Sequence, residues 1–217
     1  MKVFKRTPGR PQDDQLPARR EREILGVATV VFARKGYRQA DVQVVADQAG
    51  VGKGTVYRYF PTKEKLFLAA VDAGMRELSA RVDEAVQIES DPVLQMAGAV
   101  KAYLGFFDAR PEVVELLIIE RAEFREREKP TYFAHQEKNE GKWRLFLEDA
   151  MQSGHIRRMP PERILGVMSD ALYGVIFTNH FAGRRASFEQ QAEEIMDVLL
   201  RGILAPPTAQ GRPPPQL

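Results

Sequence analysis

The sequence of 217 residues predicts an all-α protein of about nine helices, in which a three-helix head precedes a larger helical body. Three observations support this fold class. Apolar residues recur at helical spacing through most of the chain. Capping residues, prolines and glycines separate the periodic segments. No segment has the alternating pattern of a half-buried strand. The most clearly delimited helices are predicted within residues 41–60.

The composition, 44% hydrophobic and 29% charged, is typical of a globular protein with a buried core. The chain contains no Cys, which excludes disulfides and thiol chemistry and fits a reducing cytoplasm. The longest apolar run, 113–119, contains Glu115 and is too short to span a bilayer. The N-terminal residues lack the apolar region of a secretory signal. We therefore expect a cytoplasmic protein without a membrane partner.

Charge is distributed unevenly along the chain, although its formal net charge is only +2. Residues 1–66 contain 14 Lys and Arg against 7 Asp and Glu, whereas the remainder contains 18 against 23. A basic N-terminal third joined to an acidic remainder indicates a polyanion-binding part attached to another part. Chance segregation of solvated charges would give the same counts.

The N-terminal residues 1–16 are predicted to be a disordered basic arm, because their Thr-Pro-Gly-Arg-Pro segment cannot form a helix. Such an arm can lie in a DNA minor groove or remain a solvated tail. A first helix is predicted from Pro17 to Lys35, with Gly36 as its end. Three arginines near its start oppose the helix dipole, which suits phosphates nearby but also fits simple solvation.

Residues 41–60 are predicted to form two short helices joined by a tight turn. Asp41 is a suitable N-cap, and Gly50 stands where the C′ residue of a helix turns left-handed. The inward-facing apolar positions are Val42, Val45, Ala46, Ala49, Val56 and Phe60. This layout fits a helix-turn-helix, whose second helix enters the DNA major groove, and it also fits a hairpin inside an all-α core.

The outward side of the second short helix favours the DNA-binding alternative. It carries Lys53, Thr55, Arg58 and Tyr59. Two cations, a hydroxyl and a phenol on one short helix suit phosphates and base edges.

A longer ordered motif surrounds these helices. Its segments are Phe32–Tyr37 (FARKGY), Val45–Val51 (VADQAGV), Lys53–Phe60 (KGTVYRYF) and Lys63–Leu66 (KEKL). With these segments, roughly residues 20 to 80 resemble the DNA-binding domain of the tetracycline-repressor (TetR) family.

The sequence departs from the family pattern at three places. Gly52 stands where a Ser cap is usual, although Gly is tolerated at this position. Ala40 and Asp41 replace a common Thr or Ser pair, and Tyr59 stands where His is common. The last change alters one expected DNA contact.

The resemblance implies a DNA-binding domain over 17–81 and a helical effector-binding and dimerisation domain over 82–205. It implies a double-stranded DNA operator as partner. The DNA-contacting residues implied by their places in the motif are Gln43, Lys53, Gly54, Thr55, Tyr57, Arg58, Tyr59 and Lys63.

Breakers and caps delimit the remaining helices. Thr62 caps a helix that continues to about residue 90, Asp91-Pro92 begins the next, and Pro111 begins a segment that is apolar nearly all round. The densely charged stretch 120–129 is expected to be solvated. Helices over 132–153 and 161–182 follow, and Ser187 opens a last helix with a capping box. Residues 206–217 are predicted to be a disordered Pro-rich tail.

The body is expected to hold a small apolar or aromatic effector and to form a homodimer. The candidate pocket residues are large rings and one histidine: Tyr103, Phe106, Phe107, Trp143, Tyr173, Phe177 and His180. Ordinary core packing is the alternative for each of them. The candidate dimer residues, on the last two helices, are Gly174, Ile195, Leu199 and Ile203, with Gly166 also allowing close approach.

No constellation of catalytic residues is present in the sequence. The histidines are His135, His155 and His180, scattered and without metal-ligand spacing, and neither a P-loop nor a G-x-S-x-G motif occurs. We therefore expect no catalytic residue, metal or cofactor. The resemblance implies a transcriptional repressor that a small effector releases from a near-palindromic operator. The alternatives are a ligand-insensitive DNA-binding or partner-binding module and, more distantly, a helical enzyme.

Overall fold

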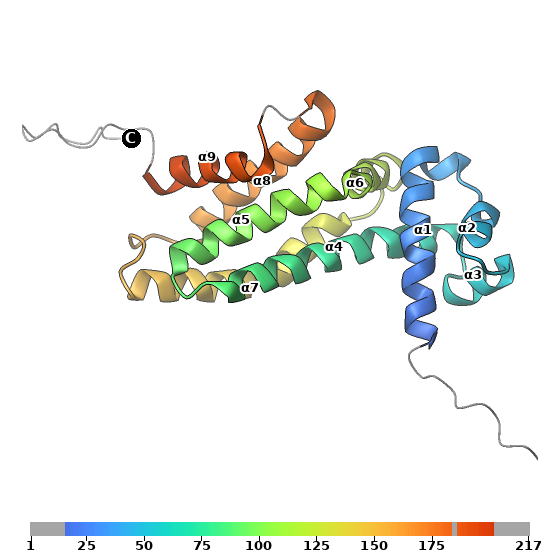
Figure 1. The fold of residues 1–217 in the computed structure, drawn as a ribbon, viewed down its shortest axis with the longest axis horizontal. Helices are drawn as coiled ribbons and strands as arrows, with labels where there is room; N and C mark the ends of the chain where they lie inside the picture. The colour runs from blue at the N-terminus through green and yellow to red at the C-terminus, as the bar shows by residue number, and fades with distance from the viewer. Residues whose placement is uncertain (1–15, 184–185, 202–217) are drawn as a thin grey trace, which may run out of the picture.

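The computed structural model describes residues 16–183 and 186–201, which form nine α-helices and contain no strand (Figure 1). The predicted tail 206–217, Ile203 and all but the last residue of the predicted arm lie outside these residues. The helices are α1 (Leu16–Gln39), α2 (Val42–Gln48), α3 (Lys53–Tyr59), α4 (Lys63–Ile88), α5 (Pro92–Ala109), α6 (Pro111–Glu123), α7 (Thr131–Gln152), α8 (Pro161–Ala182) and α9 (Phe188–Arg201).

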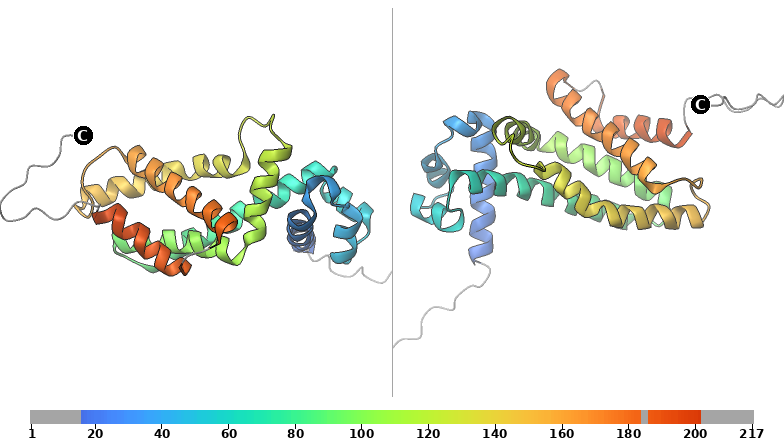
Figure 2. Two further views of the ribbon diagram at one scale, coloured as in Figure 1. Left: turned by 90° about the horizontal axis from the view of Figure 1, so that it is seen from above. Right: turned by 180° about the vertical axis from the view of Figure 1, so that it is seen from behind.

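The helices divide into two groups along the long axis of the molecule. Helices α1–α3, here called the head, lie together at one end, and α4 runs from the head into the second group, α4–α9, here called the body (Figure 1). Within the body, α4 packs along α5, and α7 and α8 lie beside each other, as Figure 2 shows from behind. Helix α6 reaches back to α1, so it joins α4 in connecting the two groups.

The caps expected from the sequence define the helix starts in the structure. An Asp41 carboxylate oxygen accepts the Gln43 amide at 2.8 Å, and Thr62 Oγ1 accepts the Lys65 amide at 3.1 Å. Asp91 accepts the Val93 amide at 2.7 Å. Gly50 lies in the turn between α2 and α3 and has a φ of 64°, which glycine adopts without a Cβ clash.

Helix α1 is longer than predicted at its C-terminal end. Gly36, the predicted end, adopts φ 73° and ψ 166°, and a further short turn follows it to Gln39. Gly36 therefore breaks the regular helix as expected, but the chain resumes a helical path immediately afterwards.

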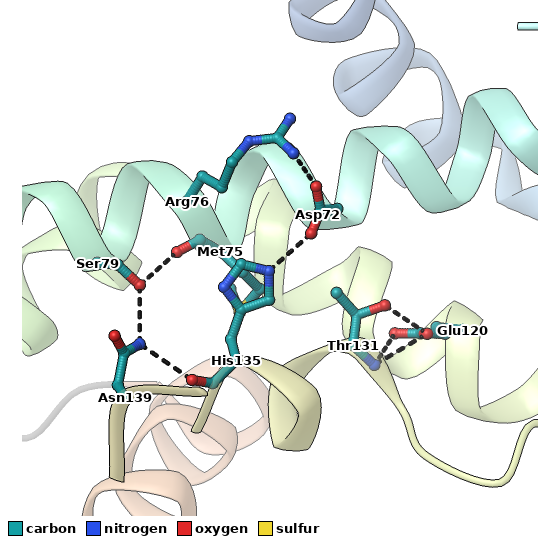
Figure 3. A network of polar contacts seen from close by, with 8 residues as sticks. All are labelled: Asp72, Met75, Arg76, Ser79, Glu120, Thr131, His135 and Asn139. Atoms are coloured by element: carbon teal, nitrogen blue, oxygen red, sulfur yellow. Dashed lines mark hydrogen bonds and ion pairs between the residues drawn. The ribbon is translucent and has the colours of Figure 1, made fainter. Parts of the chain in front are cut away.

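One expectation for the body is wrong at a single residue. Most of the stretch 120–129 is exposed or partly exposed, as a solvated segment should be, but the Glu120 side chain is buried with 1% of its surface exposed. Its carboxylate accepts the Thr131 amide at 3.1 Å and the Thr131 hydroxyl at 2.7 Å (Figure 3). Arg127 lies 3.4 Å away. The buried charge is compensated by three donors, two on Thr131 at the start of α7 and one on Arg127 in the connector between α6 and α7.

Close approach of helices explains one glycine in the body. A Cβ added at Gly74 of α4 would lie 3.0 Å from a Val113 methyl group of α6. The absence of a side chain lets α6 lie directly against α4 near the head. Among the described residues, no helix combines the length and apolar character that crossing a bilayer requires.

Candidate nucleic-acid interface and effector cavity

Completely buried apolar residues hold α3, the second helix of the predicted helix-turn-helix, against the rest of the head. Val45 of α2 and Val56 of α3 are completely buried, and Phe60, directly after α3, is 5% exposed. Ile24 and Phe32 of α1 complete this core without exposed surface. Because its inner side is anchored in this way, α3 presents its other side at a defined orientation.

The predicted DNA-contacting residues lie on the outer side of α2, α3 and the start of α4. Gln43, Gly54, Tyr57 and Arg58 are exposed. Four others are partly exposed, namely Lys53, Thr55, Tyr59 and Lys63. The Arg58 guanidinium lies 5.5 Å from the centre of the Tyr59 ring, so these two side chains form one cation–π pair on the surface.

Two of these side chains have carboxylate partners in α2 or at its N-cap. Lys53 Nζ lies 3.4 Å from an Asp41 carboxylate oxygen, and Gln43 Nε2 donates to Asp47 at 2.7 Å. The Gln43 amide and, secondarily, Lys53 hold the pKa of Asp41 below its usual range. Both pairs are exposed, so a phosphate can compete with the carboxylates for the donors.

Lys63 has a different environment from the other candidates. Its Nζ donates to the Arg38 carbonyl at 3.0 Å and lies 5.0 Å from the centre of the Tyr37 ring. Lys63 therefore joins the first turn of α4 to the end of α1, a structural role that the sequence did not indicate.

An aromatic cluster connects the head to the body. Phe67 of α4 packs edge-on against Phe32, with 5.1 Å between ring centres, and Phe124, at the end of α6, stacks on Phe67 at 5.4 Å. Tyr37 contacts Phe124 at 4.9 Å. Beside this cluster, Arg38 Nε donates to Glu123 at 2.8 Å. Aromatic contacts and an ion pair thus hold the end of α6 against the end of α1.

A cavity of about 560 Å³ lies in the body between α4, α5, α7 and α8. Of the seven predicted pocket residues, Tyr103 and Trp143 line it. Phe106 lines a separate open groove between α4, α5 and α9. Phe107, Tyr173, Phe177 and His180 line neither; Phe107 is 5% exposed, and His180 Nε2 lies 3.0 Å from Glu115.

Most of the cavity wall consists of residues that the sequence analysis did not select. They include Met75, Leu78, Met96, Phe146, Met168 and Leu172. Met75 and Leu78 continue the inner face of α4, one turn after another, so their helical spacing was the available signal. That spacing predicts burial, but it cannot distinguish a filled core from a cavity wall.

Hydroxyl groups form a polar patch on the cavity wall. The hydroxyls of Tyr103 and Tyr132 lie 2.9 Å apart, and Gln136 Nε2 donates to Ser169 Oγ at 2.6 Å. Burial raises the pKa of Tyr103 well above the usual tyrosine value and also raises the pKa of Tyr132. Both phenols therefore stay neutral at physiological pH and are available as hydrogen-bonding groups.

A set of polar contacts joins this wall to α4 (Figure 3). His135 Nε2 of α7 lies 2.7 Å from an Asp72 carboxylate oxygen, and Asp72 also pairs with Arg76. Asn139 Nδ2 donates to Ser79 Oγ at 3.3 Å. His135, Asn139 and Ser79 also line the cavity. A ligand in the cavity would therefore touch side chains that form the contact between α4 and α7.

The outer side of α8 and α9 is poorly covered by the chain itself. Ile176 is the one buried residue among the 22 of α8. Val167 and Phe181 are 53% and 71% exposed, and Val198 of α9 is 51% exposed. Gly174 is also exposed, and a Cβ added there would meet no atom within 4 Å. Ile195 and Leu199 are partly exposed on α9.

Within the described residues, no group of three or more His, Cys, Asp or Glu side chains is placed to hold a metal ion. The polar groups of the head suit DNA, and those of the cavity suit a small molecule.

Comparisons with known proteins agree with this geometry. Residues 24–70 match the model of the family described as bacterial regulatory proteins, tetR family. The uncharacterised HTH-type transcriptional regulator YhgD of Bacillus subtilis is 28% identical over 73% of this chain and 83% of its own length. The HTH-type transcriptional repressor KstR of Mycobacterium tuberculosis is 34% identical, over 34% of this chain and 33% of its own length.

The body resembles a solved structure as well. FadR of Bacillus subtilis, crystallised in complex with stearoyl-CoA, superposes with a TM-score of 0.70 at 20% identity, over 84% of this chain and 99% of that one. This likeness concerns the whole helical fold, whereas the family match covers the helix-turn-helix and the helices beside it. Over the helix-turn-helix and the helices beside it, the chain is thus similar to the tetR family of bacterial regulatory proteins, and its whole helical fold is similar to that of FadR.

Proposed function

We propose that this protein is a transcriptional repressor that binds a near-palindromic operator as a homodimer and leaves it when a small apolar effector enters the body cavity. One observation carries the proposal: α4 supports the head at its first turn and lines the cavity in its middle. DNA and effector therefore act on the same helix. The stearoyl-CoA bound in FadR supports an effector role for a body of this fold.

In this proposal, α3 lies in the major groove. Thr55 and Lys53 read base edges, while Arg58, Tyr57, Tyr59 and the backbone at Gly54 approach the DNA beside them. Gln43, on α2, adds a contact to the backbone. Lys63 is a phosphate contact that would exchange its bond to the Arg38 carbonyl for a phosphate oxygen.

The proposed dimer interface is the uncovered side of α8 and α9, around Gly174, Ile195 and Leu199. Its support is the exposed apolar surface there, which a second copy would remove from water. An interface with two-fold symmetry places two recognition helices about 34–36 Å apart on successive turns of DNA, and further apart on a longer site.

The proposed dimer has two states that differ in the distance between its two heads. Regulation then depends on how much more tightly the effector binds one state than the other. A ligand with a roughly 100-fold preference for one state shifts the equilibrium by about 2.7 kcal/mol. Two physical connections are available: the continuous helix α4, and α6, whose end is bound to α1 through Phe124 and the Glu123–Arg38 pair.

The first experiment is selection of bound sequences from random DNA duplexes, which gives the site and its symmetry. On the selected operator, Lys53→Ala or Thr55→Ala should cost about 1–3 kcal/mol where a base edge is read. Lys63→Ala should weaken all duplexes alike and reduce the salt slope by about 1, whereas the exposed body residue Lys138 serves as a matched Lys→Ala control. Unchanged binding in all head variants would refute the proposed interface.

The dimer is tested separately by sedimentation. Leu199→Glu places a charge in the proposed interface, so we expect monomers with reduced operator affinity. A wild-type protein that is monomeric at micromolar concentration would refute the interface. Operator release in a screen of hydrophobic compounds would separate a repressor from a DNA-binding module that ignores ligands.

A further inference from the structure

The charges around the body cavity are arranged unfavourably for an anion. Four carboxylates line it, those of Asp83, Glu137, Glu140 and Glu162. Their side chains are 46%, 63%, 44% and 55% exposed, so they stand at the solvent edge of the cavity. An anion that approaches the cavity therefore meets carboxylates, each already paired with a Lys or Arg, before it meets the apolar wall.

The cations near the cavity are already paired. Lys129, the one Lys or Arg in the lining, pairs with Glu137, and His135 contacts Asp72. Lys142 pairs with Asp83. Arg144 donates to Glu140 at 2.7 Å, while its Nε lies 3.3 Å from Glu162 without forming a hydrogen bond. A bound carboxylate or phosphate would have to displace one of these protein carboxylates to gain a cation.

The inner wall, in contrast, offers neutral hydrogen-bonding groups. Tyr103 and Tyr132 are 9% and 8% exposed, and their hydroxyls contact each other. Ser169 accepts from Gln136 and also shares a hydrogen bond with Tyr132, so its hydroxyl belongs to the same neutral network. These groups can satisfy a ligand hydroxyl or carbonyl, but they cannot neutralise a buried charge, which is costly without a counter-ion.

Resting on the proposed function, we infer that the effector is an uncharged, largely apolar molecule with one hydroxyl or carbonyl group, and that the cavity discriminates against anions of the same size. The apolar part packs among Met75, Leu78, Met96 and Phe146. The polar group binds at the Tyr103–Tyr132 hydroxyls.

The test uses three probes with the same alkyl chain and different charges: 1-decanol, decanoate and decyltrimethylammonium, each below its aggregation limit. Trp143 is the only tryptophan of the chain and lines the cavity, so its fluorescence reports occupancy in the full-length protein without a label. We expect decanol to bind at least about tenfold more tightly than either ion, because the buried charge has no free partner.

Two sets of variants test which residues cause the preference for the uncharged probe. Tyr103→Phe and Tyr132→Phe should each weaken decanol by about five- to tenfold, since a ligand hydroxyl loses its partner. Tyr37→Phe, the same change in the aromatic cluster at the end of α1 and outside the cavity lining, should leave decanol binding unchanged. Asp83→Asn combined with Glu137→Gln frees Lys142 and Lys129, and should raise the affinity for decanoate by at least about fivefold at low salt.

Each possible outcome either supports or overturns the inference. Tightest binding of decanol, with the two sets of effects above, supports it. Equal or tighter binding of decanoate or of the cation overturns it, and so does the absence of binding by any probe. Operator binding is measured on the same samples, so a protein that binds decanol but does not release DNA would refute the proposed regulation while the ligand chemistry stands.

Discussion

The head and the body are built from the same kind of helix but differ in how completely their side chains are packed. In the head, Ile24, Phe32, Val45 and Val56 are completely buried. In the body, α8 has one buried residue in 22, and four helices surround a cavity of about 560 Å³. Close packing is the usual state of a protein interior, so the body is the exceptional region.

The difference indicates where each region can change. The head is closed on its inner side, so it presents its outer residues as a rigid surface, which suits docking to a DNA groove of fixed shape. The body has both an internal space and an uncovered outer side, on which the proposed effector binding and dimerisation depend. Substitutions that change packing should therefore act differently in the two regions, and this contrast can be tested.

The largest effect on the free energy of unfolding is expected when an aromatic ring is removed from the core of the head. Phe32→Ala should lower the free energy of unfolding by about 3–5 kcal/mol, because the surrounding helices cannot close the resulting space. The matched change in the cavity wall, Phe146→Ala, should cost clearly less, since Phe146 is partly exposed and already borders empty space. Urea denaturation followed by circular dichroism measures both, and equal losses would contradict the comparison.

The buried carboxylate between α6 and α7 should give the next largest effect. Glu120→Ala leaves the Thr131 amide and hydroxyl without an acceptor, and should cost about 2–3 kcal/mol of stability. Glu126→Ala, in the connector that follows α6 and exposed, is the control and should change the unfolding free energy little. The same urea titrations give both values, and a near-neutral Glu120→Ala would mean that the carboxylate does not hold this junction.

Replacing a buried alanine with a larger residue should change stability in opposite directions in the head and in the body. Ala28→Leu in the head should destabilise by about 1–2 kcal/mol, because Ala28 is completely buried among packed neighbours. Ala99→Leu points into the cavity, and filling it should raise stability by up to about 1 kcal/mol. Thermal unfolding by calorimetry distinguishes the two, and Ala99→Leu should also reduce decanol binding. Destabilisation of the same size at both sites would mean that the body is as closely packed as the head.

The smallest effect concerns pH. The Gln43 amide and Lys53 lower the pKa of Asp41, so ionised Asp41 favours the folded head. This contribution is present above the ordinary carboxyl pKa of 3.8 and is lost as pH falls through the lowered value in the folded protein. The Gln43 amide signal in NMR spectra should titrate below pH 3.8, and Asp41→Asn should abolish that titration. A midpoint above the ordinary value would contradict the assignment.

Sequence patterns predicted the head in more detail than the body. Asp41, Gly50 and Thr62 are capping residues, and each acts on backbone groups within three residues of itself, so their roles can be inferred locally. The placement of Val45 and Val56 follows from helical spacing in the same way. The DNA contacts themselves remain predictions; the structure shows only that all eight residues are exposed or partly exposed.

The body depends on contacts between residues far apart in the chain. Phe106 and Phe107 are neighbours in α5, yet Phe106 borders the groove beside α9 and Phe107 packs inside. In α6, apolar nearly all round, no pattern indicates which side meets α1. Glu120 looked like part of a charged surface, and its burial depends on Thr131, which the fold brings back across the connector.

Helix α4 also has a mechanical consequence. Its 26 residues form a rod about 39 Å long at 1.5 Å per residue. If the body end of such a rod tilts by about 5°, the other end moves by about 3 Å. A displacement of this size is comparable to the length of a hydrogen bond. A rearrangement of side chains around a small ligand, too slight to alter the shape of the body, could therefore move a recognition helix out of register with its groove.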